Sequence, residues 1–334
     1  MAFPAFSVPV LRRFSAAIVA AFTGCLFLTA VICDRSHAQD DLPAPETVSL
    51  DAKDGALIAC SWYPSPKSED EGKTVVPVIV LHGWGGTRTQ YDALATSLQA
   101  RGHAVVVPDL RGHGSSTIIK RPARPEDSEL KIDNGKAKLD GRTIPSKFVI
   151  DAMWRYDVEA VKKFLMQKNN VGEVNIELLA VVGVEEGALV AINWVALDWS
   201  WPTLAARKQG KDVKAMALVS PVTSFEGVTT MNALKSRDVP RDLSAMIIVG
   251  SLSSRVYSVA RRLHQQLKMG RPPTPETEEA RRAKQTLWLI ELKTVLQGQK
   301  LLARDAFEID KKIAGFIHYR LVNKVDQYPW KDRS

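Results

Sequence analysis

The chain has 334 residues, of which 45% are hydrophobic, so it is long and apolar enough to bury a large core. Its formal net charge is +8, and the basic residues are scattered without interleaved aromatic residues. Nucleic-acid-binding proteins concentrate basic residues on one face, so this composition argues against a nucleic-acid partner. The scattered charges are typical of solvated helix faces.

The N-terminus has the pattern of an export signal. An arginine pair precedes the apolar stretch Phe14–Cys33, and small residues follow at Ser36 and Ala38. This order predicts a signal peptide over residues 1–38, which sends the protein to the periplasm or the exterior of a bacterial cell. The alternative is an uncleaved membrane anchor, because about 20 apolar residues suffice to span a bilayer.

Cleavage after Ala38 would change the charge and the cysteine content. It leaves 42 basic and 36 acidic side chains, a net charge of +6. Of the three cysteines, only Cys60 would remain, so the mature protein could form no internal disulfide. Cys60 lies in an apolar stretch that is typical of a strand, and we expect it to be an inert core residue.

Residues 39–46 are expected to form a flexible lead-in, residues 47–325 one domain and residues 326–334 a tail. Within the domain, strand and helix patterns alternate. Strands are expected at 47–50, 56–63, 75–81, 104–110, 178–184, 215–220, 245–250 and 287–292. Helices are expected at 91–98, 154–165, 186–199, 255–267 and 306–322. The alternation predicts an α/β fold with a mostly parallel sheet of about eight strands and helices on both faces.

Three details of this pattern make local predictions. Asp54-Gly55 between the first two strands indicates a hairpin turn. Asp305 and Glu308 form a capping-box pattern at the start of the last helix. Residues 117–147 are polar and interrupt the alternation, so we expect a lid or surface insertion over the carboxyl edge of the sheet.

Three motifs identify the fold more specifically. An apolar strand runs into His82-Gly83-Trp84-Gly85-Gly86, the next into Asp109-Leu110-Arg111-Gly112-His113-Gly114, and a third into Gly183-Val184-Glu185-Glu186-Gly187. With this order and spacing, residues 47–325 resemble the α/β-hydrolase superfamily, nearest to serine-aminopeptidase-like and lysophospholipase-like enzymes. The last motif stands where that family has G-x-S-x-G, the turn that carries the nucleophilic serine.

The resemblance implies an oxyanion hole at this turn. In the family, a main-chain N–H of the first glycine loop and the N–H after the nucleophile stabilise a developing oxyanion. These donors would here be the N–H groups of Trp84 and Glu186. The glycine loop also builds a tight turn after a strand, and both roles are compatible.

The resemblance also implies catalytic positions that this chain does not fill. Glu185 stands in place of the nucleophilic serine, Ser253 in place of the acid, and Gln297 in place of the histidine base, with Gln299 as an alternative alignment. A glutamine side chain cannot take up a proton at ordinary pH. Glu226 is a possible alternative acid. His82 and His113 lie near the site edge, where they hold turns in the family.

Glu185 itself could attack a carbon electrophile, since relatives with an aspartate here open epoxides or remove halides. Without a histidine, however, the resulting ester would persist. A carboxylate at a helix N-terminus is also stabilised by the helix dipole. We therefore expect the Glu185 carboxylate to fold into the oxyanion hole.

The sequence thus predicts an exported α/β-hydrolase-fold protein that has lost hydrolase activity and has a binding or scaffold role. Its crevice would take a small molecule, peptide or protein, and a membrane would be involved only if the N-terminal segment is uncleaved. The alternative is an active hydrolase of esters, amides, epoxides or halides that uses Glu185 or relocated residues. The chain contains no metal-binding motif and no cofactor motif.

Overall fold

The structure is a computed structural model, and it describes residues 42–120, 130–133, 136–139, 142–144, 146–202, 204, 208–235, 243–269, 271–273, 276–279 and 284–334. The expected signal peptide lies outside these residues, as do residues 39–41 of the lead-in. The chain divides into two compact units, residues 1–42 and 43–334, and the second is described here. In the described ranges, no helix is both long and apolar enough to cross a bilayer.

The domain begins with the expected hairpin. Strands β1 (Glu46–Asp51) and β2 (Leu57–Tyr63) pair antiparallel on either side of Asp54-Gly55. Gly55 has a φ of 90°, a backbone conformation that glycine adopts without steric cost.

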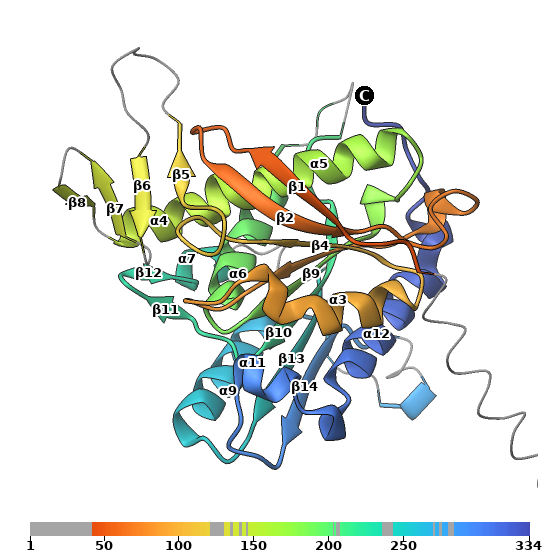
Figure 1. The fold of residues 1–334 in the computed structure, drawn as a ribbon. Helices are drawn as coiled ribbons and strands as arrows, with labels where there is room; N and C mark the ends of the chain where they lie inside the picture. Colours follow the sequence, from red (N-terminus) through yellow and green to blue (C-terminus); the bar gives the residue numbers. More distant parts are fainter. Residues whose placement is uncertain are drawn as a thin grey trace, which may run out of the picture. The chain divides into compact units, whose positions relative to one another are not determined.

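One sheet of eight strands forms the centre of the domain, in the order β1-β2-β4-β3-β9-β10-β13-β14 (Figure 1). The six strands that follow the hairpin are β3 (Pro77–Leu81), β4 (Ala104–Pro108), β9 (Leu179–Val184), β10 (Val213–Val219), β13 (Ser244–Gly250) and β14 (Leu287–Leu292). From β4 to β14 all neighbours pair in parallel. The predicted α/β class with a mostly parallel sheet is confirmed.

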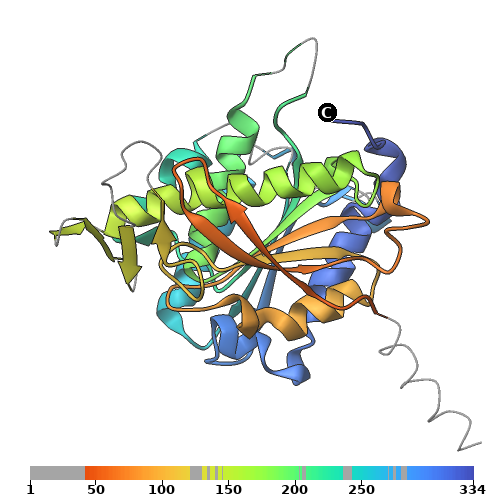
Figure 2. The same ribbon diagram turned by 45° about the horizontal axis from the view of Figure 1, so that its top comes forward.

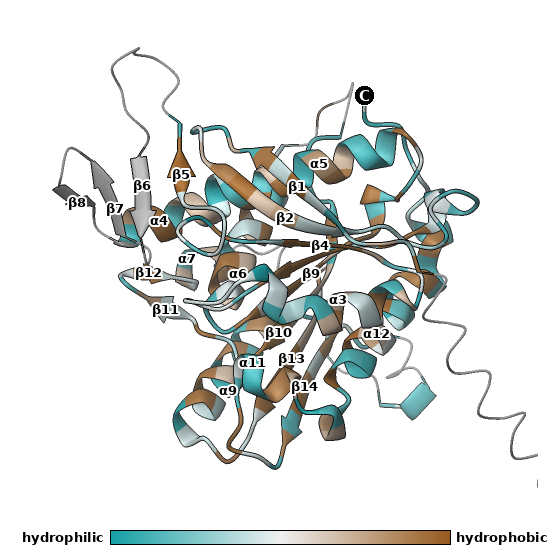
Figure 3. Cartoon of the chain, viewed as in Figure 1, coloured by the Kyte–Doolittle hydropathy of each residue, from teal (hydrophilic) through white to brown (hydrophobic). Residues whose placement is uncertain are grey.

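Helices cover both faces of this sheet (Figure 2). On one face lie α4 (Ser146–Ala152), α5 (Val158–Asn170), α6 (Glu186–Ser200) and α9 (Ser254–Lys268); on the other lie α3 (Asp92–Gln99), α11 (Gly298–Leu302) and α12 (Ile309–Arg320). Two separate apolar clusters correspond to these two layers. The central strands are strongly apolar (Figure 3), as expected for strands covered on both faces.

The capping-box prediction for the last helix is wrong. The helix α12 begins at Ile309, its start has no side-chain cap, and Asp305 opens a separate 3₁₀ turn, Asp305–Phe307. Glu308 has a φ of 47°, a left-handed conformation that interrupts the helical backbone between the two elements. Sequence alone placed one continuous helix here, because both segments share the same apolar spacing.

The polar insertion forms a sheet of its own. Strands β5 (Ile118–Ile119), β6 (Leu130–Asp133), β7 (Lys136–Leu139) and β8 (Arg142–Ile144) pair antiparallel in chain order. Strand β7 contacts α4, and α4 also contacts the short strand β12 (Val228–Thr229). Figure 1 shows β5 to β8 on the same side as β11 (Ser224–Phe225) and β12.

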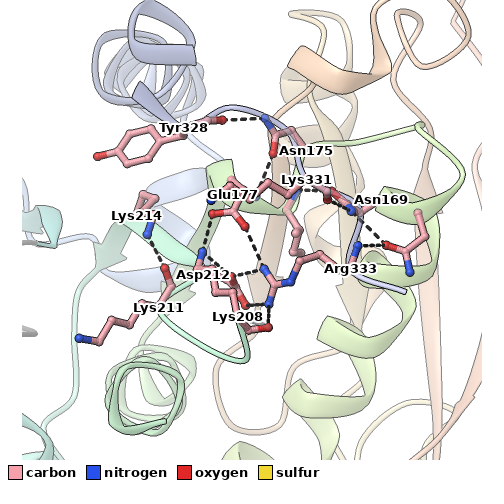
Figure 4. Close-up of polar contacts among 12 residues, drawn as sticks. Asn169, Asn175, Glu177, Lys208, Lys211, Asp212, Lys214, Tyr328, Lys331 and Arg333 are labelled. Atoms are coloured by element: carbon pink, nitrogen blue, oxygen red, sulfur yellow. Dashed lines mark hydrogen bonds and ion pairs between the residues drawn. The ribbon is translucent and has the colours of Figure 1, made fainter. Parts of the chain in front are cut away.

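Residues 326–334, which were expected to form a tail, pack onto the domain. The side chain of Arg333 donates to carboxylates of Glu177 and Asp212 at 2.9 Å each and to the Lys208 carbonyl at 2.8 Å (Figure 4). Only 4% of this side chain is exposed. The amides of Asn169 and Asn175 donate to the carbonyls of Lys331 and Tyr328.

Candidate functional site

The turn between β9 and α6 has the strained backbone that the nucleophile turn of this fold requires. Glu185 has φ 52° and ψ −116°, which a residue with a side chain rarely adopts and which costs on the order of 1–3 kcal/mol. Its N–H donates to the Val219 carbonyl at 3.0 Å, and its carbonyl accepts from the N–H groups of Ala188 and Val222. Strand β10, the loop after it and the first turn of α6 therefore hold Glu185 in this conformation.

The two glycines of the turn allow α6 to approach the sheet closely. A Cβ at Gly187 would lie 2.3 Å from the Leu81 carbonyl oxygen, and a Cβ at Gly183 would lie 2.7 Å from Cα of Ala188. Both distances are far below van der Waals contact. The glycine spacing of the motif thus serves packing here, independently of which residue occupies position 185.

The Trp84 N–H of the first glycine loop, which was expected as an oxyanion-hole donor, is already bonded to a side chain of the protein. The Trp84 N–H donates to Oε2 of Glu186 at 2.9 Å. We expected the Glu185 carboxylate at this position, and that expectation is wrong: the residue after it occupies the donor. A carboxylate oxygen of Glu186 thus lies where the developing oxyanion of a substrate would lie in a hydrolase.

The Glu185 carboxylate lies instead toward the loop after β14. A Cβ at Gly298 would lie 2.0 Å from Cδ of Glu185, so only glycine leaves room for the side chain. The backbone N–H of Gln299 and the charge of Lys300 stabilise the carboxylate. Burial, and then the charge of Glu186, nevertheless raise the pKa of Glu185 above its ordinary value of 4.5.

Gln297, at the position expected for the histidine base, is a structural cross-link. Its Oε1 accepts from the Ser220 hydroxyl at 2.7 Å and from the Gly250 N–H at 3.2 Å. Its Nε2 donates to the Gly250 carbonyl at 2.7 Å. The amide therefore ties the ends of β10 and β13 to the loop after β14, and it offers no proton acceptor for catalysis.

Ser253 and Glu226, the two positions considered for a catalytic acid, lie in separate loops. Ser253 precedes α9, and its carbonyl accepts from the Tyr257 N–H, while its side chain makes no capping bond. Glu226 has a φ of 46° at the exposed tip of the β11–β12 hairpin. In the described residues, neither side chain forms a hydrogen bond with Gln297 or Glu185.

The two histidines near the site hold turns together. His82 Nε2 accepts from the Leu110 N–H at 2.9 Å, so Nδ1 carries the proton and donates to the Gly83 carbonyl at 2.8 Å. Burial lowers the pKa of His82 to about 4. His113 Nδ1 lies 3.1 Å from the Arg111 carbonyl, and burial lowers the His113 pKa as well. Within the part of the chain that the structure describes, no histidine ring hydrogen-bonds to Glu185.

A crevice of about 500 Å³ opens above Glu185. The glycine loop forms one wall and the loop after β14 the other; it is lined by residues 83–86, Gln90, Tyr91, Glu185, 295–297, Gln299 and Lys300. Its volume falls within the range of small-molecule sites. Among the described residues, no group of three His, Cys, Asp or Glu side chains is arranged to hold a metal ion.

Sequence reasoning missed three contributors to this site. The side chain of Glu186 was not considered, and neither was Ser220, whose Oγ also accepts from the Gly298 N–H at 2.9 Å. Tyr91 was assigned only to a helix face, yet its hydroxyl accepts from the Gly83 N–H and it lines the crevice. Each contact joins residues of different elements, which no local pattern reveals.

Comparisons with known proteins agree with this geometry. The model of the alpha/beta hydrolase fold family matches residues 76–242, and no curated protein matches the chain. Similar solved structures include an esterase from Pyrococcus furiosus, with 16% identity, a TM-score of 0.52 and coverage of 83% of this chain and 93% of that one. A Rhizomucor miehei esterase has 14% identity, a TM-score of 0.53 and coverage of 87% and 88%.

A hyperthermophilic esterase from Pyrobaculum calidifontis is similar to the same degree, with 14% identity, a TM-score of 0.53 and coverage of 84% and 87%. At these identities, the structural likeness establishes the fold alone. The family model covers half of the chain and includes both the glycine loop and the turn at Glu185. The chain belongs to the α/β-hydrolase family.

Proposed function

We propose that this protein is a non-catalytic member of the α/β-hydrolase family that binds a small molecule or peptide in the crevice above Glu185. The observation that carries this proposal is the hydrogen bond from the Trp84 N–H to Oε2 of Glu186 at 2.9 Å. Removal of a single oxyanion donor costs an acyl-transfer enzyme about 10²–10³ in kcat. Here the donor is bonded to a carboxylate of the protein itself.

The other catalytic positions support the same proposal. Glu185 replaces a neutral nucleophile by a carboxylate, and the Gln297 amide is engaged in three hydrogen bonds. Both histidines near the site are neutral at pH 7 and bonded to backbone groups. A carboxylate nucleophile would form an ester that needs an activated water for hydrolysis, and no histidine ring among the described residues hydrogen-bonds to Glu185.

We further propose that the protein works outside the cytoplasm. The support for export is the N-terminal sequence alone: an arginine pair, an apolar stretch from Phe14 to Cys33 and small residues before position 39. Mass determination of the N-terminus of protein isolated from its source cells tests this step. A chain that begins at residue 39 supports export, and a chain that retains residues 14–33 supports an anchor.

Activity assays test the proposed loss of catalysis. The purified protein and its Glu185→Ala variant are incubated with p-nitrophenyl esters, a p-nitroanilide, an epoxide and a haloalkane. We expect no turnover above the blank from either protein. Turnover that disappears in Glu185→Ala makes Glu185 the nucleophile and overturns the proposal. Turnover that persists in both identifies relocated catalytic residues and overturns it as well.

A further inference from the structure

The crevice contains a carboxylate, and two backbone N–H groups beside it are already bonded to other acceptors. The two backbone N–H groups at the start of the glycine loop are bonded, that of Gly83 to the Tyr91 hydroxyl and that of Trp84 to Glu186. The Glu185 carboxylate can accept about four hydrogen bonds. Among the described residues, Lys300 attracts it through its charge without a direct ion pair, and the Gln299 N–H is its one hydrogen-bond donor.

The charge around Glu185 is unfavourable for a second anion. Glu185 and Glu186 are consecutive, and the repulsion between them contributes to the raised pKa of Glu185. Burial first, and the charges of both glutamates in addition, raise the pKa of Tyr91 to about 12. Lys300 is the one cationic side chain among the lining residues, and it is exposed at the rim.

A small cavity adjoins the crevice behind Gly83 and Trp84 and contains another unused acceptor. His113 and Glu186 line it, together with mostly apolar side chains. Because His113 Nδ1 faces a carbonyl oxygen, the proton lies on Nδ1 and Nε2 carries a lone pair. His113 is 6% exposed, and its Nε2 has no hydrogen-bond partner among the described residues.

Trp84 lines both the crevice and the small cavity. Its ring packs edge-on against His113, with centroids 4.8 Å apart, and tilted by 55° against Phe225, with centroids 5.0 Å apart. Indole faces attract organic cations, an effect worth about 0.5–2 kcal/mol. The exposed side chain of Val295 gives the mouth of the crevice an apolar edge.

We propose that the crevice binds a small organic ammonium compound, with the protonated amine donating to the Glu185 carboxylate beside the ring of Trp84. The inference rests on the proposed non-catalytic function and specifies its ligand class. An ammonium group brings up to three donors to the Glu185 carboxylate, and it neutralises a half-buried charge. A carboxylate or phosphate ligand would meet two glutamates and an oxyanion donor that is already bonded.

Three probes of the same shape test the ligand class by titration calorimetry: benzylamine, benzyl alcohol and benzoate. We expect benzylamine to bind and the other two to bind at least tenfold more weakly, since a charge-assisted hydrogen bond favours its ligand by about this factor. Absence of benzylamine binding at millimolar concentrations overturns the proposal, as does binding of benzoate with equal or higher affinity.

Two variants test the residues. Glu185→Gln preserves the shape of the side chain, and we expect it to lower the affinity for benzylamine about tenfold or more. Lys300→Gln removes the competing cation at the rim and should raise the affinity severalfold. Glu71→Gln makes the same charge change on an exposed side chain before the amino end of β3 and should leave binding unchanged. Unchanged affinity in Glu185→Gln, with the variant folded, overturns the proposal.

The outcomes separate the ligand class from the proposed function. If benzoate binds and Lys300→Gln abolishes this binding, the proposed ammonium ligand class is wrong, but the non-catalytic binding role remains possible. Ester turnover that depends on Glu185 overturns the proposed function, whatever the probes bind. Thermal melting of each variant shows whether it is folded. The Lys300 side chain is exposed, so we expect Lys300→Gln to fold, and its effect on benzylamine affinity tests the proposal even if Glu185→Gln is unfolded.

Discussion

The carboxylate of Glu186 accepts a hydrogen bond from the Trp84 N–H across 102 positions of sequence. It joins the first turn of α6 to the glycine loop after β3, the two parts that build an oxyanion hole in an active hydrolase. In this protein the bond places a side-chain carboxylate on the N–H that was expected as an oxyanion donor. The same bond anchors the glycine loop.

Glu186→Ala should destabilise the protein by about 1–3 kcal/mol, because it removes a charge-assisted bond to a partly buried donor. Glu186→Gln, which keeps a side-chain carbonyl oxygen, should lose less. Urea denaturation of both variants measures the difference. We also expect no ester turnover in Glu186→Ala, since Glu185 and Gln297 remain; an equal loss of stability in both variants contradicts the hydrogen bond.

Glu185→Gln should raise the Tm at pH 7. The pKa of Glu185 is raised in the folded protein, so the folded state binds this proton more tightly than the unfolded chain. The stabilising contribution of the group is therefore present below its ordinary pKa of 4.5 and disappears as the pH rises through the raised value. Melting curves of both proteins should differ at pH 7 and converge below pH 4.5. A lower Tm for the variant than for the wild type at pH 7 would contradict this prediction.

Gly298→Ala should clash with Glu185, because its Cβ would lie 2.0 Å from the carboxyl carbon. Alanine at a φ of 53° also carries a backbone cost of about 1–2 kcal/mol. In a Glu185→Ala background only the backbone cost remains. A double-mutant cycle by urea denaturation should therefore give a coupling of about 1–2 kcal/mol, and additive losses would show that the two residues do not meet.

Arg333→Ala should lower the stability by about 2–3 kcal/mol, because it leaves buried carboxylates of Glu177 and Asp212 with fewer partners. Lys208 and Lys162 remain beside Asp212 and limit the loss. Lys311→Ala breaks an exposed pair with Glu308 and serves as the control, with an expected loss below about 1 kcal/mol. Equal losses in the two variants would mean that the C-terminal segment contributes no more than a surface ion pair.

Acid should destabilise the protein through His82, whose pKa is lowered from 6.5 to about 4 by burial. The unfolded chain takes up this proton first, so the contribution is present above pH 6.5 and is lost as the pH falls toward 4. The full effect is on the order of 3 kcal/mol. Urea denaturation at pH 7 and pH 4.5 should show a smaller pH dependence in His82→Gln than in the wild type, and equal dependence would contradict the neutral buried ring.

Local patterns were enough to predict the sheet and most of its helices. Asp54-Gly55 predicted the hairpin, and the glycine motifs predicted the family, because turn chemistry and buried apolar strands leave local signatures. The break before Ile309 was missed, since the apolar spacing continues across it. The strands of the 117–147 insertion were missed as well, because their polar, charged sequence resembles that of a loop.

The direction of side chains at the site could not be read from the sequence. Two consecutive glutamates follow Val184, and which of them reaches the Trp84 N–H depends on the positive φ of Glu185 and on how close α6 lies to the glycine loop. The room for the other carboxylate depends on Gly298, more than 100 positions away. Such relationships are fixed by tertiary packing.

Hydrogen exchange at the Trp84 amide, followed by NMR in the wild type and in Glu186→Ala, tests the central claim most directly. If the Glu186 carboxylate occupies the oxyanion-hole donor, this amide is protected in the wild type and exchanges much faster in the variant, while core amides of β9 are unchanged. Equally fast exchange in both proteins would show that the donor is open to a substrate, and the account of a filled oxyanion hole would be wrong.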